Sequence, residues 1–162
     1  RCVPNATESR HDIIQAVELQ SEEAMIAFCK GIQAAAPVDS FAIEPNGYDI
    51  ILAASVLEHL DARESAIRKI QEIAEGIRPG GAAMILMNTG VKEWDADTGE
   101  MLDAQFEVNL PPEEARALFA DTFRGWEVLW DKTIHYEYEV PRGDRTAMIS
   151  AEVVTFTARR TA

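Results

Sequence analysis

The sequence predicts an α/β fold in which a doubly wound, mostly parallel sheet ends in a C-terminal antiparallel hairpin. Two short apolar runs, Ile50–Ala54 and Ala82–Met87, are typical of parallel strands buried on both faces. The segment between them, Asp61–Ile77, has apolar residues at helical spacing, so the three elements predict a right-handed βαβ crossover. Two long alternating segments, Trp126–Val140 and Thr146–Ala158, predict strands joined by a short turn, which makes them antiparallel neighbours.

The helix predicted over Asp61–Ile77 has a clear apolar stripe and signals at both ends. Asp61 is a candidate N-cap, and Glu64 three residues later completes the pattern of a capping box. Pro79 and the two glycines after it end the helix and turn the chain toward the next strand. The stripe consists of Ala62, Ala66, Ile67, Ile70, Ile73, Ala74 and Ile77.

The remaining segments complete an alternating order of strands and helices. His11–Leu19 predicts a short buried strand, and Ser21–Ile32 an amphipathic helix. Asn88–Asn109 has little periodicity and many Gly, Asp and Thr residues, and a connection of this length is usually a lid or a mobile loop. Pro111–Thr122 predicts a helix, because Pro and two acidic residues at its start match the preferences of a helix N-terminus.

Composition narrows the function classes. The 162 residues, 47% of them hydrophobic, predict a single domain over residues 1–162, and the formal net charge of −13 argues against nucleic acid or an anionic membrane as partner. No apolar run reaches the roughly 18 residues that span a membrane, and the N-terminus has no signal-peptide pattern. The two cysteines form no disulfide framework or metal spacing, so we expect a reducing, cytoplasmic setting.

Three motifs carry a resemblance to class I S-adenosylmethionine-dependent methyltransferases, whose sheet is Rossmann-like. They are Ala16-Val17-Glu18 at a strand end, the stretch from Tyr48-Asp49-Ile50-Ile51 to Leu57-Glu58-His59-Leu60, and Arg78-Pro79-Gly80-Gly81 before a strand. Together they cover most of the chain. The resemblance implies S-adenosylmethionine as cofactor and methyl transfer to a small-molecule acceptor.

Within that class, the sequence is most similar to the tellurite-resistance-type branch and its small-molecule relatives, through Phe119–Glu127 and Thr157–Arg160. It departs from the family in lacking the glycine loop Gly-x-Gly-x-Gly and the strand before it, and the family spacing would place Arg1 directly after that loop. We therefore expect an N-terminally truncated or degenerate member whose first, central strand is missing. This expectation includes a gap between the strand that ends at Glu18 and the strand that begins at Tyr48.

The resemblance assigns candidate residues to the nucleoside end of the cofactor. Glu18, with Leu19 beside it, lies at a strand end, where a carboxylate can accept both ribose hydroxyls; the alternative is an ordinary solvated glutamate. Asp39 and Ser40 lie where the family places an acid against the adenine amino group; the alternative is a turn.

The other candidates follow the two apolar strands. Ala53, Ala54 and Ser55 are small enough to leave room for the methionine end of the cofactor and the acceptor, or they form a tightly packed corner. His59 is a candidate general base or, with Glu58, a metal ligand, but we favour a histidine packed beneath the lid and expect no metal site. Asn88 is a second candidate catalytic residue, and it either faces the acceptor or lies in a surface loop.

Methyl transfer from a sulfonium needs alignment and exclusion of water more than acid–base groups, so the lack of a catalytic triad is compatible with it. The principal alternative is a non-catalytic remnant of the fold that serves as a structural or interaction domain. A third interpretation, an NAD-binding domain, is weaker because its glycine fingerprint is also absent and the terminal antiparallel hairpin fits it poorly.

Overall fold

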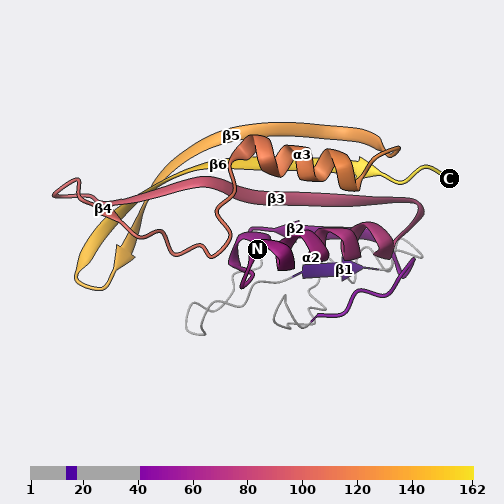
Figure 1. Ribbon diagram of the computed structural model, residues 1–162, viewed down its shortest axis with the longest axis horizontal. Coiled ribbons are helices and arrows are strands. Elements are labelled where there is room, and N and C mark those ends of the chain that lie inside the picture. The colour runs from indigo at the N-terminus through magenta and orange to yellow at the C-terminus, as the bar shows by residue number, and fades with distance from the viewer. Residues whose placement is uncertain (1–13, 18–40) are drawn as a thin grey trace.

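The protein is described by a computed structural model covering residues 14–17 and 41–162 (Figure 1). Its strands form one sheet in the order β1-β2-β3-β6-β5, with the short β4 paired to β3. The α/β class with a C-terminal antiparallel hairpin is therefore confirmed. The elements are β1 (Ile14–Val17), β2 (Tyr48–Ala54), the 3-10 turn η1 (Leu57–His59), α2 (Arg63–Gly76), β3 (Ile77–Asp95), β4 (Met101–Leu102), α3 (Pro112–Thr122), β5 (Glu127–Arg142) and β6 (Arg145–Arg159).

The expected parallel majority is not found among the described strands. Only β2 and β3 pair in parallel, in a register from Ile50 opposite Ala82 to Ala54 opposite Leu86, and α2 forms the crossover between them. The pairs β1–β2, β3–β4, β3–β6 and β5–β6 are all antiparallel. The helix predicted over residues 21–32 lies outside the described residues.

The expected gap beside β2 is wrong. β1 pairs directly with β2, from Ile14 opposite Ala53 to Val17 opposite Ile50, and the two strands are antiparallel. The physical reason is that an edge of β2 without a neighbour would leave a row of backbone N–H and C=O groups unpaired. A strand of either direction satisfies those groups, so the apolar pattern alone did not determine the direction.

The capping box predicted for α2 is also wrong. The helix begins at Arg63 after an extended Ala62, and no side chain of the described residues caps its N-terminus. Asp61 is exposed and precedes the first helical residue by two positions. The predicted apolar stripe is correct at its centre, where Ala66, Ile70 and Ile73 are fully buried against the sheet.

The first residues of β3 depend on close backbone approach. Arg78 donates hydrogen bonds to the carbonyl oxygens of Asn46 (3.0 Å) and Gly47 (2.8 Å), which ties the start of β3 to the residues just before β2. A Cβ at Gly81 would lie only 2.5 Å from the carbonyl oxygen of Asp49. Only glycine allows the backbone segments at residues 49 and 81 to approach so closely.

The predicted loop over Asn88–Asn109 is wrong in its first third, because β3 continues to Asp95. The strand has a bulge between Thr89 and Lys92, where Gly90 has φ +56°. Beyond the bulge it still pairs with β6, ending with Asp95 opposite Ala147. The bulge accommodates the extra residue without ending the ladder.

The buried side chains of β6 change face along the strand. Val154, Phe156 and Ala158 belong to the main core, which also contains buried residues of α2 and α3. Ala151 and Ile149 belong instead to a smaller cluster with Val91, covered by Ala104, Phe106 and Val140. Because successive residues of a strand point to opposite faces, this change of phase places the two clusters on opposite faces of the sheet.

The segment 103–110 leads from one face of the sheet to the other at the bulge of β3. Gly90 donates its N–H to the carbonyl oxygen of Leu110 (2.8 Å). The side chain of Asn109 accepts the N–H of Val91 (2.8 Å) and donates to the carbonyl oxygen of Val91 (2.9 Å). Phe106 thus covers the smaller cluster, and α3, which follows directly, covers the main core.

In the hairpin of β5 and β6, β5 forms one edge of the described sheet and β6 lies between β5 and β3 (Figure 1). Both strands are close to the prediction, with the turn at Gly143 and Asp144. Within the described part of the chain β5 pairs only with β6, and large apolar side chains on it are exposed, including Trp130, Ile134 and Tyr136. Among the helices of the described residues, none has the length and apolar character needed to cross a membrane.

Candidate functional site

The candidate site lies where the parallel pair β2 and β3 ends. Ala53 is buried, whereas Ala54 and Ser55 are exposed. Ser55 donates its N–H to the carbonyl oxygen of Leu86 on β3 (2.9 Å) and has φ +51°. A left-handed conformation is uncommon for a residue other than glycine and is found frequently at functional sites.

Asn88 connects the two strand ends. Its side-chain Nδ2 donates to Ser55 Oγ (3.3 Å) and also to Glu58 Oε1. The backbone N–H of Asn88 donates to the same Glu58 oxygen (3.3 Å). Ser55, Glu58 and Asn88 therefore form one hydrogen-bonded group, which we call the strand-end cluster.

Glu58 is the most unusual member of the strand-end cluster. It is fully buried, and its Oε2 is a buried oxygen without a hydrogen-bond partner among the described residues. Burial raises the pKa of the Glu58 carboxyl above its ordinary value, and hydrogen bonds from backbone and Asn88 donors oppose that change only in part. A buried oxygen without a partner costs free energy, so this position is either strained or completed by another group.

His59 packs beneath the segment 103–110. Its ring stacks on Phe106 with centroids 5.0 Å apart, and its Nδ1 lies 3.9 Å from Glu107 Oε2. Val108 in the same segment donates its N–H to the carbonyl oxygen of Glu58 (3.0 Å). The segment is thus held over η1, next to the strand-end cluster.

The structure brings together only some of the predicted site residues. Ser55 and Asn88 are in contact, Ala53 and Ala54 lie directly before them, and His59 follows Glu58. Glu18, Leu19, Asp39 and Ser40 lie outside the described residues. Two residues of this region are not among the predicted site residues: Glu58, which the sequence suggests only as a metal ligand, and Phe106. An acidic residue between Leu57 and Leu60 is the sequence signal for a buried carboxyl. In the described ranges, no group of three or more His, Cys, Asp or Glu residues is placed to hold a metal ion.

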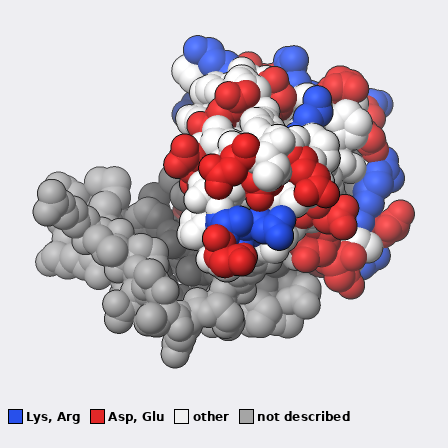
Figure 2. All heavy atoms as spheres, turned by 90° about the vertical axis from the view of Figure 1, so that its left-hand side faces the viewer, with Lys and Arg blue, Asp and Glu red and all other residues white. Residues whose placement is uncertain are grey.

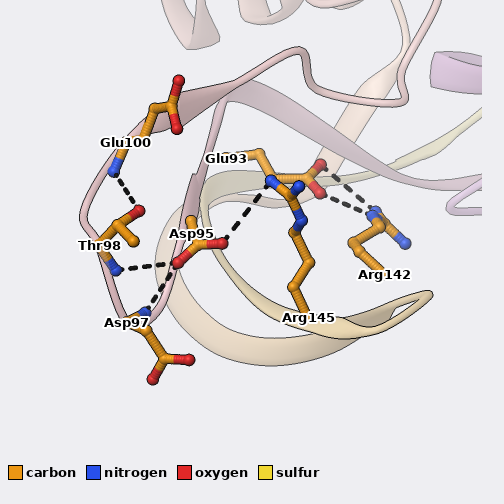
Figure 3. Close-up of polar contacts among 7 residues, drawn as sticks. All are labelled: Glu93, Asp95, Asp97, Thr98, Glu100, Arg142 and Arg145. Carbon is orange, nitrogen blue, oxygen red and sulfur yellow. Dashed lines mark hydrogen bonds and ion pairs between the residues drawn. The ribbon is translucent and has the colours of Figure 1, made fainter.

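A second polar cluster lies at the far end of β3 and serves the turn into β4 (Figure 3). Asp95 Oδ1 accepts the N–H groups of Asp97 (3.0 Å) and Thr98 (2.9 Å), and the Thr98 hydrogen bond is the main cause of a lowered pKa at Asp95. Buried Glu93 forms a two-pronged ion pair with Arg142 of β5, at 2.6 and 3.3 Å. These carboxylates already have partners, which indicates a structural role.

This end of the molecule is acidic at its surface. Figure 2 shows Asp and Glu side chains covering much of it, with fewer Lys and Arg residues between them. The distribution agrees with the formal net charge of −13. Such a surface repels polyanions and favours solubility.

The fold matches solved methyltransferases. TehB from Haemophilus influenzae superimposes with a TM-score of 0.55 at 20% identity, over 87% of this chain and 48% of TehB, so the chain spans about half the length of that protein. A protein from Bacillus halodurans, provisionally assigned as a methyltransferase, gives a TM-score of 0.52 at 9% identity, over 77% of this chain and 75% of its own. At these identities the similarity shows the fold alone, which is the α/β fold of these two proteins.

The sequence itself has one partial match to a protein family. A family model described as methionine gamma-lyase matches residues 1–56, which is about a third of the 162 residues. The match ends before η1 and includes neither Glu58 nor Asn88, and its extent does not show membership of that family. No curated protein matches the sequence.

Proposed function

We propose that the chain is part of an S-adenosylmethionine-dependent methyltransferase that acts on a small-molecule acceptor by in-line displacement. The observation that carries the proposal is the strand-end cluster at the carboxyl ends of β2 and β3. Ligands of open α/β sheets bind outside the carboxyl ends of the strands. The methyltransferase fold and the sequence motifs agree with this position.

The residues present fit the methionine end of such a cofactor. Ala54 and Ser55 are small and exposed, so they leave space at the strand end. Glu58 Oε2 is a buried acceptor with no partner among the described residues, as expected beside a cationic ligand. We further propose that Glu18, Leu19, Asp39 and Ser40 hold the ribose and adenine.

The bound cofactor supplies a methyl group activated by its sulfonium charge. The chain itself has to orient the acceptor and exclude water. We propose that Ser55 and Asn88 orient the acceptor through their polar side chains, and that the segment 103–110 limits access of water. His59, whose side chain is 22% exposed, would accept a proton where the acceptor has to lose one.

Net charge and cysteine content support two further parts of the proposal, the class of partner and the cellular setting. A net charge of −13 favours a small metabolite over a nucleic acid or a membrane surface as partner. Two cysteines without a disulfide framework favour a cytoplasmic setting, and we treat residues 1–162 as one domain.

The rival proposal is a non-catalytic remnant of the fold, and calorimetry separates the two. The chain, shown to be folded by circular dichroism, is titrated with S-adenosylmethionine and with S-adenosylhomocysteine. Saturable binding of either ligand supports the methyltransferase. If a folded chain produces no heat of binding at millimolar ligand, the remnant is the better description.

A further inference from the structure

Glu58 is a buried acid without a compensating cation in the part of the chain that the structure describes. None of the ion pairs between described residues includes it, whereas the equally buried Glu93 has Arg142 as partner. The titratable groups that interact with it are His59, next to it on η1, and Tyr138 of β5. Glu107 lies beside His59, and Glu93 and Arg142 act on Tyr138. Arg142 is already paired with Glu93, and His59 carries a positive charge only when it is protonated.

The electrostatics of this surrounding favour a proton on Glu58. Burial raises the pKa of its carboxyl. Burial also raises the pKa of the Tyr138 hydroxyl on β5; Arg142 opposes that change, and the carboxylates of Glu58 and Glu93 add to it. The Tyr138 hydroxyl is thus close enough to Glu58 to interact with it. A cation bound at the strand ends would instead favour the ionised form of Glu58, because an opposite charge nearby stabilises a carboxylate.

The two forms of the proposed cofactor differ in this property. S-adenosylmethionine carries a sulfonium charge, and its product S-adenosylhomocysteine does not. We propose that Glu58 is the residue by which the site distinguishes the charged donor from the neutral product, and that donor binding releases the proton of Glu58 to the solvent. This inference rests on the proposed function.

The inference predicts a specific dependence on pH. Donor binding stabilises ionised Glu58, so donor affinity rises with pH while free Glu58 is protonated and becomes constant once it is ionised. One released proton corresponds to a rise of at most about tenfold per pH unit. The product has no sulfonium charge, so its affinity lacks this increase, and the donor-to-product affinity ratio grows with pH.

Calorimetry in buffers of different ionisation enthalpy measures the protons released on binding. The full chain is titrated with each ligand between pH 5 and pH 8, together with Glu58→Gln and the control Glu107→Gln, which removes a half-exposed charge near His59. We expect proton release with the donor and not with the product, lost in Glu58→Gln and kept in Glu107→Gln.

Equal proton counts for both ligands, or a difference that persists in Glu58→Gln, would overturn the inference while leaving the methyltransferase proposal intact. Absence of binding of both ligands to the folded chain would overturn both. The comparison of donor with product on the unaltered chain decides the question even where Glu58→Gln does not fold.

Discussion

Glu58 shows how one side chain links stability to pH. Its carboxyl is buried and its pKa is raised above the ordinary value of 4.5, so the folded chain holds the proton more tightly than the unfolded chain. The contribution of Glu58 to the free energy of unfolding is therefore greatest below the pKa of the unfolded chain, and it is lost as the pH rises through the pKa of the folded chain. The sign is opposite to that of most acidic residues in proteins.

Replacing Glu58 by Gln tests this directly. Gln keeps the size of the side chain and does not ionise, so Glu58→Gln removes a contribution that falls with rising pH. We therefore expect the melting temperature at pH 7.5, relative to that at pH 4, to be higher in Glu58→Gln than in the unaltered chain. Thermal unfolding followed by circular dichroism measures it, with Glu107→Gln as control. A pH dependence identical to that of the unaltered chain would contradict a raised pKa at Glu58.

The ion pair of Glu93 and Arg142 predicts a second residue-level effect. Arg142→Met would leave the buried Glu93 carboxylate uncompensated, and we expect a loss of about 2–3 kcal/mol, less than for a fully buried pair because Arg142 is 22% exposed. The control Arg124→Met breaks an exposed pair with Asp121 and should cost at most about 0.5 kcal/mol. Urea unfolding compares them; equal losses would show that burial of Glu93 does not matter.

At the level of elements, α3 is attached to the sheet mainly by Phe119. This side chain is fully buried, and its ring lies 5.5 Å from that of Phe156 on β6. We expect Phe119→Ala to lower the free energy of unfolding by about 3–5 kcal/mol, and the control Leu118→Ala, at a half-buried position of the same helix, by about 1 kcal/mol. Urea unfolding tests both, and a small loss for Phe119→Ala would mean that α3 packs differently.

The segment 103–110 is a second element with a testable attachment. Asn109→Ala removes both hydrogen bonds to Val91, and we expect a loss of about 1 kcal/mol together with faster amide exchange at Val91 and Val108. Asp103→Ala, at an exposed position of the same segment, is the control. Unchanged exchange at Val108 would show that the segment stays attached without Asn109.

The elements also show which parts of the fold can be predicted from local sequence. α3 and the hairpin strands were predicted to within a few residues, because proline, acidic residues and alternation are local signals. β3 was predicted too short, since its extension carries Lys92, Glu93 and Asp95, whose burial or exposure depends on β6 and Arg142. The contact of Glu58 with Asn88, thirty residues apart, follows from the parallel register and has no signal within either segment.

At the scale of the whole molecule, the sheet direction was the least predictable feature. The apolar pattern of β2 is compatible with either direction of a neighbour, so the antiparallel β1 could not be inferred from it. The residues predicted for ribose and adenine lie outside the described part, and thus only the part of the candidate site that we propose for the methionine end of the cofactor has a structural description.

The exposed apolar side chains of β5 predict that molecules of this protein associate with one another. We expect light scattering to increase as the pH approaches the sequence pI of about 4.6, where repulsion between molecules disappears. Ile134→Lys should reduce that increase, and Thr133→Lys on the opposite side of the strand is the control for added charge. Equal scattering of Ile134→Lys and the unaltered chain at pH 4.6 would argue against association through this part of β5.

Among the described residues, no strand pairs with the outer side of β5, and this has a consequence for how the protein stays dispersed. A strand with one row of free backbone groups is a template for a further strand, whichever chain supplies it. Protection against this growth comes from charge, both on the strand itself, which carries Lys132, Glu137 and Glu139, and distributed over the rest of the molecule. The protein thus stays dispersed because its molecules repel one another. Added salt screens this repulsion and promotes association without changing the fold, because the exposed edge of β5 stays the same.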